Sequence, residues 1–310
     1  MTPRFFRIAR LLSAAAVLLA ALAPAPAWAC ACGCGVFDVS TSALLPAHPG
    51  GIAYLEFDSL NQNRNWSGSK RAPDGDNADK RIATNFFTAG VQYMFGRSWG
   101  VMAEVPYWNR LFKTTNDDGN VVDSIHPSIG DIRVRGVYAG FSEDMSAGVT
   151  FGLKLPTGDF AYANFDRDTE IGTGSTDLLL GAYKLGRFGD APWGWFSNVQ
   201  WDEPAIAAGG YRPGAEVDAV AGVYFDRWRL GGVKIAPTAH AILTQRWRDE
   251  GPLAKSGDSG GRRLVLSPGL ETFFGSVRVY GDVGFPVYQY VNGNQLVASI
   301  LYKLNVGYVF

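Results

Sequence analysis

The chain closes on Leu301-Tyr302-Lys303-Leu304-Asn305-Val306-Gly307-Tyr308-Val309-Phe310, and the pattern of this stretch decides the fold class. Alternate positions from Tyr302 to Phe310 are large and apolar, whereas Lys303, Asn305 and Gly307 stand between them. Side chains alternate across a β-strand, so one face of this strand is apolar and the other is polar. Aromatic residues at both ends of the apolar face are typical of strands in membrane-spanning β-barrels. A strand of a soluble β-sandwich could show the same alternation, so the choice depends on the rest of the chain.

The N-terminus predicts export from the cytoplasm. Arg4, Arg7 and Arg10 precede an apolar run over residues 11–22, and Ala27-Trp28-Ala29 follows as a small-x-small cleavage site. This is the pattern of a secretory signal peptide, which we assign to residues 1–29. Cleavage would leave Cys30 as the first mature residue. Lipid modification of Cys30 is an alternative outcome, which Trp28 disfavours because a small residue is normally found at its position.

Composition narrows the class further. The 310 residues carry a formal net charge of -1, with 47% hydrophobic and 13% aromatic residues. A general nucleic-acid-binding protein would need a basic surface, so the sequence predicts no nucleic-acid partner. No segment after Cys30 is long and apolar enough to cross a bilayer as a helix. Two classes remain, an exported soluble β-protein and a transmembrane β-barrel.

The rhythm of strands and connections favours the barrel. Alternating patterns predict about twelve strands, near residues 51–61, 82–95, 99–111, 130–141, 147–156, 175–186, 194–203, 214–225, 230–244, 262–274, 277–289 and 295–310. Their connections alternate between long and short, as do the external loops and periplasmic turns of outer-membrane barrels. We therefore predict an all-β fold, an antiparallel transmembrane barrel over residues 51–310. It would contact outer-membrane lipids in a Gram-negative cell, with both termini on the periplasmic side.

The polar faces of the predicted strands would line the lumen of this barrel. The charged or titratable residues that alternation places inward are Asp131, Arg133, Arg135, Lys154, Asp177, Glu216, Asp218, Lys234, His240, Glu271, Arg278, Asp282 and Lys303. They could line a water-filled path for a small solute, or pair with one another and fill the interior. Eight strands leave a packed interior and sixteen or more an aqueous channel, so a width of about twelve leaves both interpretations open.

Five short motifs carry a family resemblance. They are Gly130-Asp131-Ile132-Arg133, Leu153-Lys154-Leu155-Pro156-Thr157-Gly158, Gly172-Thr173-Gly174-Ser175-Thr176-Asp177, Ser267-Pro268-Gly269-Leu270 and Phe285-Pro286-Val287-Tyr288. In this order they resemble the outer-membrane barrel family named for the meta-pathway of phenol degradation, from about residue 80 to the C-terminus. The resemblance implies a channel or transporter for small, often aromatic compounds.

All cysteines of the chain lie in Cys30-Ala31-Cys32-Gly33-Cys34-Gly35, before the first predicted strand. In an extended segment Cys30, Cys32 and Cys34 share one face, where three thiolates could bind Cu(I) or Zn(II). An oxidising periplasm would instead allow a disulfide or pairing with another molecule. We therefore expect residues 30–50 to form a periplasmic segment, and a metal-handling or partner-docking barrel is the second functional hypothesis.

A membrane-embedded hydrolase is the third hypothesis. Gly257-Asp258-Ser259-Gly260-Gly261 is similar to the nucleophile peptide of serine proteases, and His240 lies upstream. A catalytic triad is defined by geometry and roles, and this peptide falls in a predicted external loop. The sequence therefore favours a passive channel for small solutes, without enzymatic activity and with no certain cofactor.

Overall fold

The computed structural model describes residues 49–116 and 118–310. The predicted signal peptide lies outside the described residues, and so do Cys30, Cys32 and Cys34 of the predicted N-terminal segment. Within the part of the chain that is described, no helix is long and apolar enough to cross a membrane.

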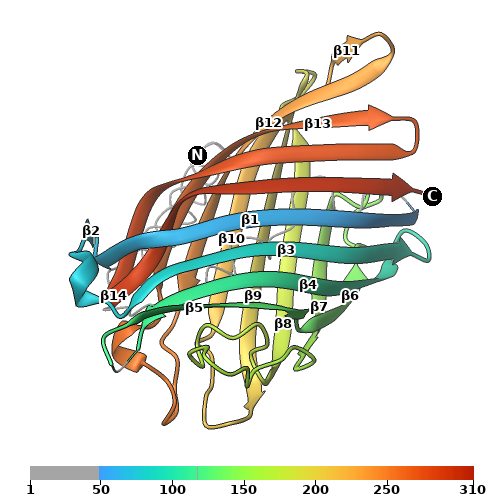
Figure 1. Cartoon of the computed structure of the whole chain (residues 1–310). Helices are drawn as coiled ribbons and strands as arrows, with labels where there is room; N and C mark the ends of the chain where they lie inside the picture. Colours follow the sequence, from blue (N-terminus) through green and yellow to red (C-terminus); the bar gives the residue numbers. More distant parts are fainter. Residues whose placement is uncertain (1–48, 117) are drawn as a thin grey trace, which may run out of the picture.

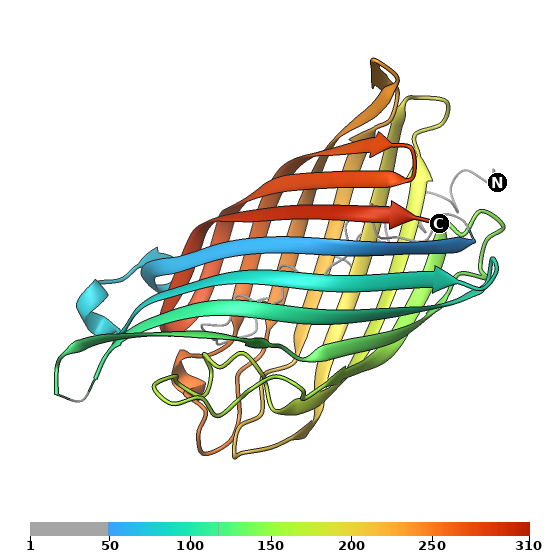
Figure 2. The same ribbon diagram turned by 45° about the vertical axis from the view of Figure 1, so that its right-hand side comes forward.

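Eleven strands pair edge to edge into a closed ring, and every neighbouring pair is antiparallel. They are β1 (Gly50–Gly68), β3 (Asp79–Met94), β4 (Trp99–Thr115), β6 (Ile132–Tyr138), β7 (Ala147–Leu155), β8 (Ser175–Arg187), β9 (Trp193–Ala207), β10 (Glu216–Phe225), β12 (Val233–Arg246), β13 (Gly261–Phe274) and β14 (Val277–Val309). Pairing of β10 with β12 and of β1 with β14 completes the ring. Figures 1 and 2 show the resulting barrel with its tilted strands. The predicted all-β antiparallel barrel is confirmed.

Strand β14 crosses the barrel wall twice. Its first part, from Val277 to Val291, pairs with β13, and its last part, up to Val309, pairs with β1. The chain must reverse between these parts, and it does so at Asn292-Gly293-Asn294, where Gly293 has φ of 48°. Glycine adopts this left-handed conformation without steric cost. The eleven ring strands therefore make twelve passes, in agreement with the predicted number.

Two predicted loops are partly strand. Residues 112–129 were predicted as a loop, but β4 continues to Thr115 and pairs there with β5 (Val121–Ile129). The pattern of β5 is interrupted by Pro127, which is tolerated because β5 pairs with β4 alone. The predicted loop 62–81 likewise contains the end of β1, the short strand β2 (Lys70–Arg71) and a 3-10 turn at Asp74–Asp76. A further short strand, β11 (Trp228–Leu230), extends a predicted short turn.

The alternation of the C-terminal stretch is observed in the structure. Leu304 and Val306 are 47% and 43% exposed, whereas Lys303 and Asn305 are 8% and 2% exposed. The same alternation gives β4 an exterior face with exposed Val101, Val105 and Tyr107 and an interior face with buried Met102. A continuous apolar exterior of this kind needs a hydrocarbon environment, because soluble monomers rarely expose large apolar patches.

Side-chain and backbone contacts between β1 and β14 stabilise the closed ring. The Lys303 ammonium lies 2.7 Å from an oxygen of Glu56, and the Asn305 amide donates to the other oxygen at 3.0 Å. At the rim, Phe310 and Gly51 exchange two backbone hydrogen bonds of 2.9 and 2.8 Å. The Phe310 ring covers Gly51 so closely that an added Cβ would lie 2.5 Å from it. A larger residue at this position would have to displace the Phe310 ring.

The half of the lumen near the short turns is filled by apolar side chains. Tyr54, Met102, Tyr183, Phe196 and Leu301 belong to this buried cluster, which we call the lower apolar cluster. It also contains Met94 and Met145, and so all three methionines of the described chain lie in it. Methionine side chains adapt readily to irregular space, so this packing is more easily rearranged than one of branched residues.

The assignment of the exterior face to lipid predicts a specific cost for Leu304→Arg. Leu304 lies six residues from the rim residue Phe310, about 20 Å along the strand and about 15 Å in height because the strand is tilted, which is close to the middle of an apolar band about 25 Å tall. An arginine there should lower the free energy of unfolding by about 2–4 kcal/mol. Urea titration of the folded barrel in lipid measures this cost.

Val121→Arg is the matched control, because Val121 is also exposed but lies at the tip of the β4–β5 hairpin. We expect a change of at most about 1 kcal/mol at that position. Equal destabilisation by the two substitutions would contradict the assignment of the exterior face.

Candidate functional site

The connection between β7 and β8, residues 156–174, folds inward over the lumen, and we call it the roof loop. Its consecutive residues Asp168, Thr169, Glu170 and Ile171 are all buried. The roof loop lies at the rim that carries the long connections (Figure 2). A polar connection of this length normally runs over the protein surface. The buried stretch therefore indicates that the roof loop has a defined fold inside the barrel.

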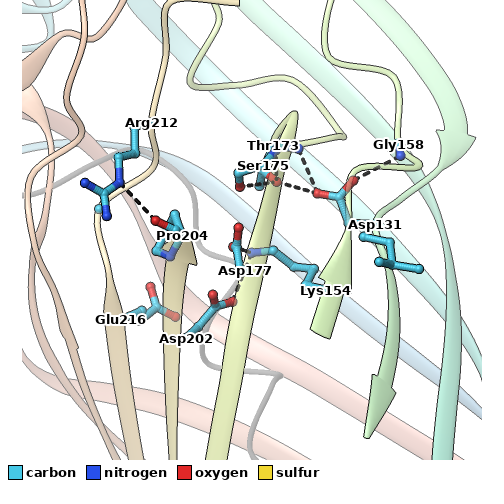
Figure 3. Close-up of polar contacts among 12 residues, drawn as sticks. Asp131, Lys154, Gly158, Thr173, Ser175, Asp177, Asp202, Pro204, Arg212 and Glu216 are labelled. Carbon is cyan, nitrogen blue, oxygen red and sulfur yellow. Dashed lines mark hydrogen bonds and ion pairs between the residues drawn. The ribbon is translucent and has the colours of Figure 1, made fainter. Parts of the chain in front are cut away.

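The two ends of the roof loop are held together by Asp131. One carboxylate oxygen accepts from the Gly158 N–H at 3.0 Å, and the other accepts from the Thr173 N–H at 2.8 Å and its hydroxyl at 2.6 Å (Figure 3). A Cβ added to Gly158 would lie 2.7 Å from the Cα of Gly172, so the two chain segments cross in direct contact. Asp131 therefore closes a narrow neck through which the roof loop leaves and rejoins the barrel wall.

Apolar and polar contacts seat the roof loop in the lumen. Ile171 inserts into a cluster that contains Phe86 and Trp108. The fully buried Arg110 donates from Nη1 to the carbonyl oxygens of Thr169 at 2.6 Å and Glu170 at 3.0 Å. Arg110 also donates from Nε to the Thr84 hydroxyl at 2.9 Å, so its guanidinium group links the strand wall to the loop backbone.

The neighbouring long connections complete the roof. Asp249, between β12 and β13, accepts from the Tyr211 hydroxyl at 2.7 Å, from the Gly214 N–H at 2.8 Å and from Arg246 at 2.9 Å. The ammonium group of Lys255 contacts Asp166 of the roof loop. Three connections are thus tied to one another above the lumen.

A cavity of about 60 Å³ lies under the roof loop, and we call it the roof cavity. Its lining combines aromatic side chains with six carboxylic acids and four cationic groups. The charged lining residues are Asp131, Arg133, Lys154, Arg167, Asp168, Glu170, Asp177, Asp202, Glu216 and Arg246. Charges of both signs in a buried space can bind a small polar molecule and orient it.

The structure brings five of the predicted lumen residues to the roof cavity, namely Asp131, Arg133, Lys154, Asp177 and Glu216. The Lys154 ammonium contacts Asp177 and lies 2.9 Å from an oxygen of Asp202 (Figure 3). Glu216 lies 4.0 Å from Arg246. Lys154 and Asp177 lie opposite each other on the adjacent strands β7 and β8, and Glu216 and Arg246 do so on β10 and β12, where opposite charges stabilise a sheet. Asp202 reaches Lys154 from β9, across β8.

The other predicted lumen residues lie elsewhere in the barrel and have local partners. Arg135 pairs with Glu104, Lys303 lies between Glu56 and Asp58, and Asp218 accepts from the Thr244 hydroxyl at 2.6 Å. Arg278 donates to Glu271, and Lys234 lies over the Phe273 ring. His240 lies 4.0 Å from Asp282, which accepts from the Tyr280 hydroxyl at 2.6 Å.

Sequence reasoning missed several partners of these residues. Glu56, Asp58, Glu104, Arg110 and Asp202 face the interior, and strand alternation would have placed each of them there. Arg167, Asp168 and Glu170 belong to the roof loop, whose inward fold has no periodic signal in the sequence.

The structure does not bring Ser259 and His240 together. Ser259 is fully buried in the connection after β12, where its hydroxyl oxygen accepts from the Asp249 N–H at 3.0 Å. His240 lies in the middle of β12, near Phe196 and Asp282. The serine–histidine pair on which the hydrolase hypothesis depends is therefore not formed.

Residues 49–116 and 118–310 contain no group of three or more histidine, aspartate or glutamate side chains placed to hold a metal ion. The predicted metal ligands Cys30, Cys32 and Cys34 lie outside these ranges.

Comparison with known proteins identifies the fold. No protein-family model matches the chain, and no curated protein sequence does. Among solved structures, an outer membrane channel from Pseudomonas putida F1 is similar, with a TM-score of 0.65 and 13% identity over 88% of this chain and 100% of that chain. The β domain of the Bordetella autotransporter BrkA is similar with a TM-score of 0.50 and 12% identity, over 84% of this chain and 100% of that chain. At these identities the likeness shows the fold alone, an outer-membrane β-barrel, which confirms the predicted fold class.

The buried acids of the roof loop make its docking pH-dependent. Burial raises the pKa of Asp168 to about 6 and that of Glu170 to about 7. Lys255 opposes the shift at Asp168, whereas nearby carboxylates add to it, namely Asp166, Asp79 and Asp249. A raised pKa means that the docked loop holds its protons more tightly than an undocked loop does. Docking is therefore most favoured at low pH and weakens as the pH rises from about 4 to about 7.

Hydrogen exchange of peptides from residues 159–171, corrected for the intrinsic pH dependence of exchange, measures this effect. We expect protection to decrease between pH 4 and 7. Asp168→Asn should remove the loss of protection that occurs below about pH 6. The loss of protection that is due to Glu170, at higher pH, should remain. Protection that rises over this range in the unsubstituted protein would contradict the assignment.

Proposed function

We propose that this protein is a passive channel for small solutes in the outer membrane of a Gram-negative cell, and that the roof loop controls its external mouth. The observation that carries the proposal is the roof cavity, a charged space inside a closed barrel that is covered by the anchored roof loop and its two neighbouring connections. A barrel wall alone would be stable with an apolar interior, and burying charge is costly unless the charges are paired. Retention of so many polar groups inside is explained if they serve a solute and its water.

Orientation follows from the proposed location. External loops of outer-membrane barrels are long and periplasmic turns are short, so the rim with the roof loop would face the outside. Both ends of the barrel domain, at Gly50 and Phe310, lie at the opposite rim, where Gly51 and Phe310 exchange two backbone hydrogen bonds. Both termini would then be periplasmic, and so would Cys30, Cys32 and Cys34. A periplasmic metal or protein partner at these cysteines is a separate hypothesis that rests on the sequence alone.

The proposed path has two constrictions. The roof loop covers the external end, and the lower apolar cluster narrows the periplasmic end. Apolar constrictions can gate a channel because water leaves them readily, and the three methionines of the cluster could move aside. Tyr54, Tyr183 and Phe196 would give small aromatic compounds an apolar surface along this half of the path.

Family resemblance agrees with that solute class. The motifs of the meta-pathway barrel family contain the residues of the neck: Asp131 from the first, Gly158 from the second, and Gly172 and Thr173 from the third. We infer that these motifs are shared because they hold the roof loop. Aromatic solutes are the class that the family implies, and we propose them as candidates on that ground.

Removal of the roof loop distinguishes between two interpretations, an open channel and a barrel whose interior is filled by side chains. Because Gly158 and Gly172 are already in contact, deletion of residues 159–171 joins the chain without stretching the neck. In planar bilayers we expect the deletion variant to show a larger single-channel conductance and longer open periods than the unmodified protein.

A matched control deletes residues 118–120 near the tip of the β4–β5 hairpin, which are exposed and do not line the roof cavity. Its conductance should equal that of the full-length chain. A folded roof-loop deletion that stays silent would show that the interior is filled, and it would refute the proposed function.

A further inference from the structure

Several charged groups that line the roof cavity have buried polar atoms without a hydrogen-bond partner among the described residues. Two of them, of opposite charge, are contributed by the roof loop: the carboxylate of Glu170 and the guanidinium group of Arg167. They lie close enough that the charge of Arg167 acts on Glu170, yet they form no hydrogen bond with each other. Polar atoms in a protein interior are normally satisfied, so each of these groups calls for an explanation.

Glu170 is fixed by its surroundings. Its backbone carbonyl oxygen accepts from Arg110 at 3.0 Å, and its side chain also accepts from the backbone of Tyr162. The second carboxylate oxygen, Oε2, is buried and has no donor among the described residues. This oxygen is a preorganised acceptor for a positively charged donor.

Arg167 is held just as firmly. Its guanidinium carbon lies 4.5 Å from the centre of the Tyr211 ring and 5.0 Å from that of Phe160, and Nη2 donates to the Thr173 carbonyl oxygen at 2.6 Å. The Nε and Nη1 atoms are buried and donate to no acceptor within the described chain. Nη1 lies on the same side of the guanidinium plane as Cδ, whereas the Nε–H lies on the side of Nη2, so Nε and Nη1 are two separate donors, and each suits one carboxylate oxygen.

Most other charges of the cavity are already engaged. Lys154 lies between Asp177 and Asp202, Asp131 accepts three hydrogen bonds at the neck, and Arg246 contacts Asp249 and Glu216. A ligand that enters the cavity would therefore meet, on the roof loop, a carboxylate oxygen of Glu170 and guanidinium N–H groups of Arg167 that have no donor or acceptor among the described residues.

We propose that the roof cavity binds a small zwitterion, a molecule such as an α-amino acid that carries an ammonium and a carboxylate group. Its ammonium group donates to Glu170, and its carboxylate accepts one charge-assisted hydrogen bond from the guanidinium group of Arg167. This proposal rests on the proposed function, because it names a class of solute for the same channel. A water needs about 10–15 Å³ of such space, so about 60 Å³ takes roughly four to six non-hydrogen atoms, the size of glycine or alanine.

Calorimetric titration of the folded protein in detergent with L-alanine tests this site directly, because binding is measured without any current. Ethylammonium and propionate are matched probes, since each carries only one of the two charged groups. We expect alanine to bind at least about tenfold more tightly than either probe. Equal affinity of alanine and one single-charge probe would overturn the proposal, as would no binding of alanine.

Glu170→Gln and Arg167→Gln should each weaken alanine binding by about tenfold or more, because each removes a charged hydrogen-bond partner. Asp166→Asn is the control in the same loop, since Asp166 pairs with Lys255 outside the cavity, and it should leave alanine affinity unchanged. Hydrogen exchange of residues 159–171 checks that the loop stays docked in each variant. Undiminished binding by both glutamine variants with a docked loop would refute the site.

The outcome is separable from that of the proposed function. Alanine binding by a barrel without conductance would uphold the site and refute the channel. Conductance without alanine binding would refute the site and leave the channel standing.

Discussion

Closure of the strand ring is the constraint on which the rest of this structure depends. A bilayer interior offers no water to unpaired backbone groups, so a sheet can cross it only if it has no open edge. Pairing of β1 with β14 removes the last edge, and the contacts of Glu56 with Lys303 and Asn305 tie these strands together from inside. Once the ring is closed with its apolar face outward, every polar face must point inward.

An interior crowded with polar side chains then needs partners within the barrel. Buried charges are stable only when they are paired and hydrogen-bonded, and pairs such as Arg135 with Glu104 meet this condition. The roof loop follows the same rule, since Asp131 and Arg110 satisfy its backbone where it enters the lumen. Glu170 and Arg167 of the roof loop keep buried atoms that have no hydrogen-bond partner among the described residues, and the proposed zwitterion would supply a partner to each.

Alternation made the strands and their faces predictable, because the side-chain period of a strand is fixed by its backbone. The inward positions of Lys154, Asp177 and Lys303 follow from this period, and so does the outward position of Leu304. Strand β5 was missed because Pro127 reads as a loop residue unless its edge position is known. The roof loop was missed for a different reason, since nothing in a non-periodic segment tells whether it folds inward or outward. Asp131, Gly158 and Thr173 are 27 and 15 residues apart in succession, and only the structure brings them into one neck.

Liposome swelling with neutral solutes of graded size tests the central claim most directly. If the protein is a passive channel, liposomes that contain it should admit the smallest solutes, and the rate should fall steeply with increasing solute size. Swelling no faster than that of protein-free liposomes, for every solute, would contradict the account, since it would mean that the polar interior serves only to hold the barrel together.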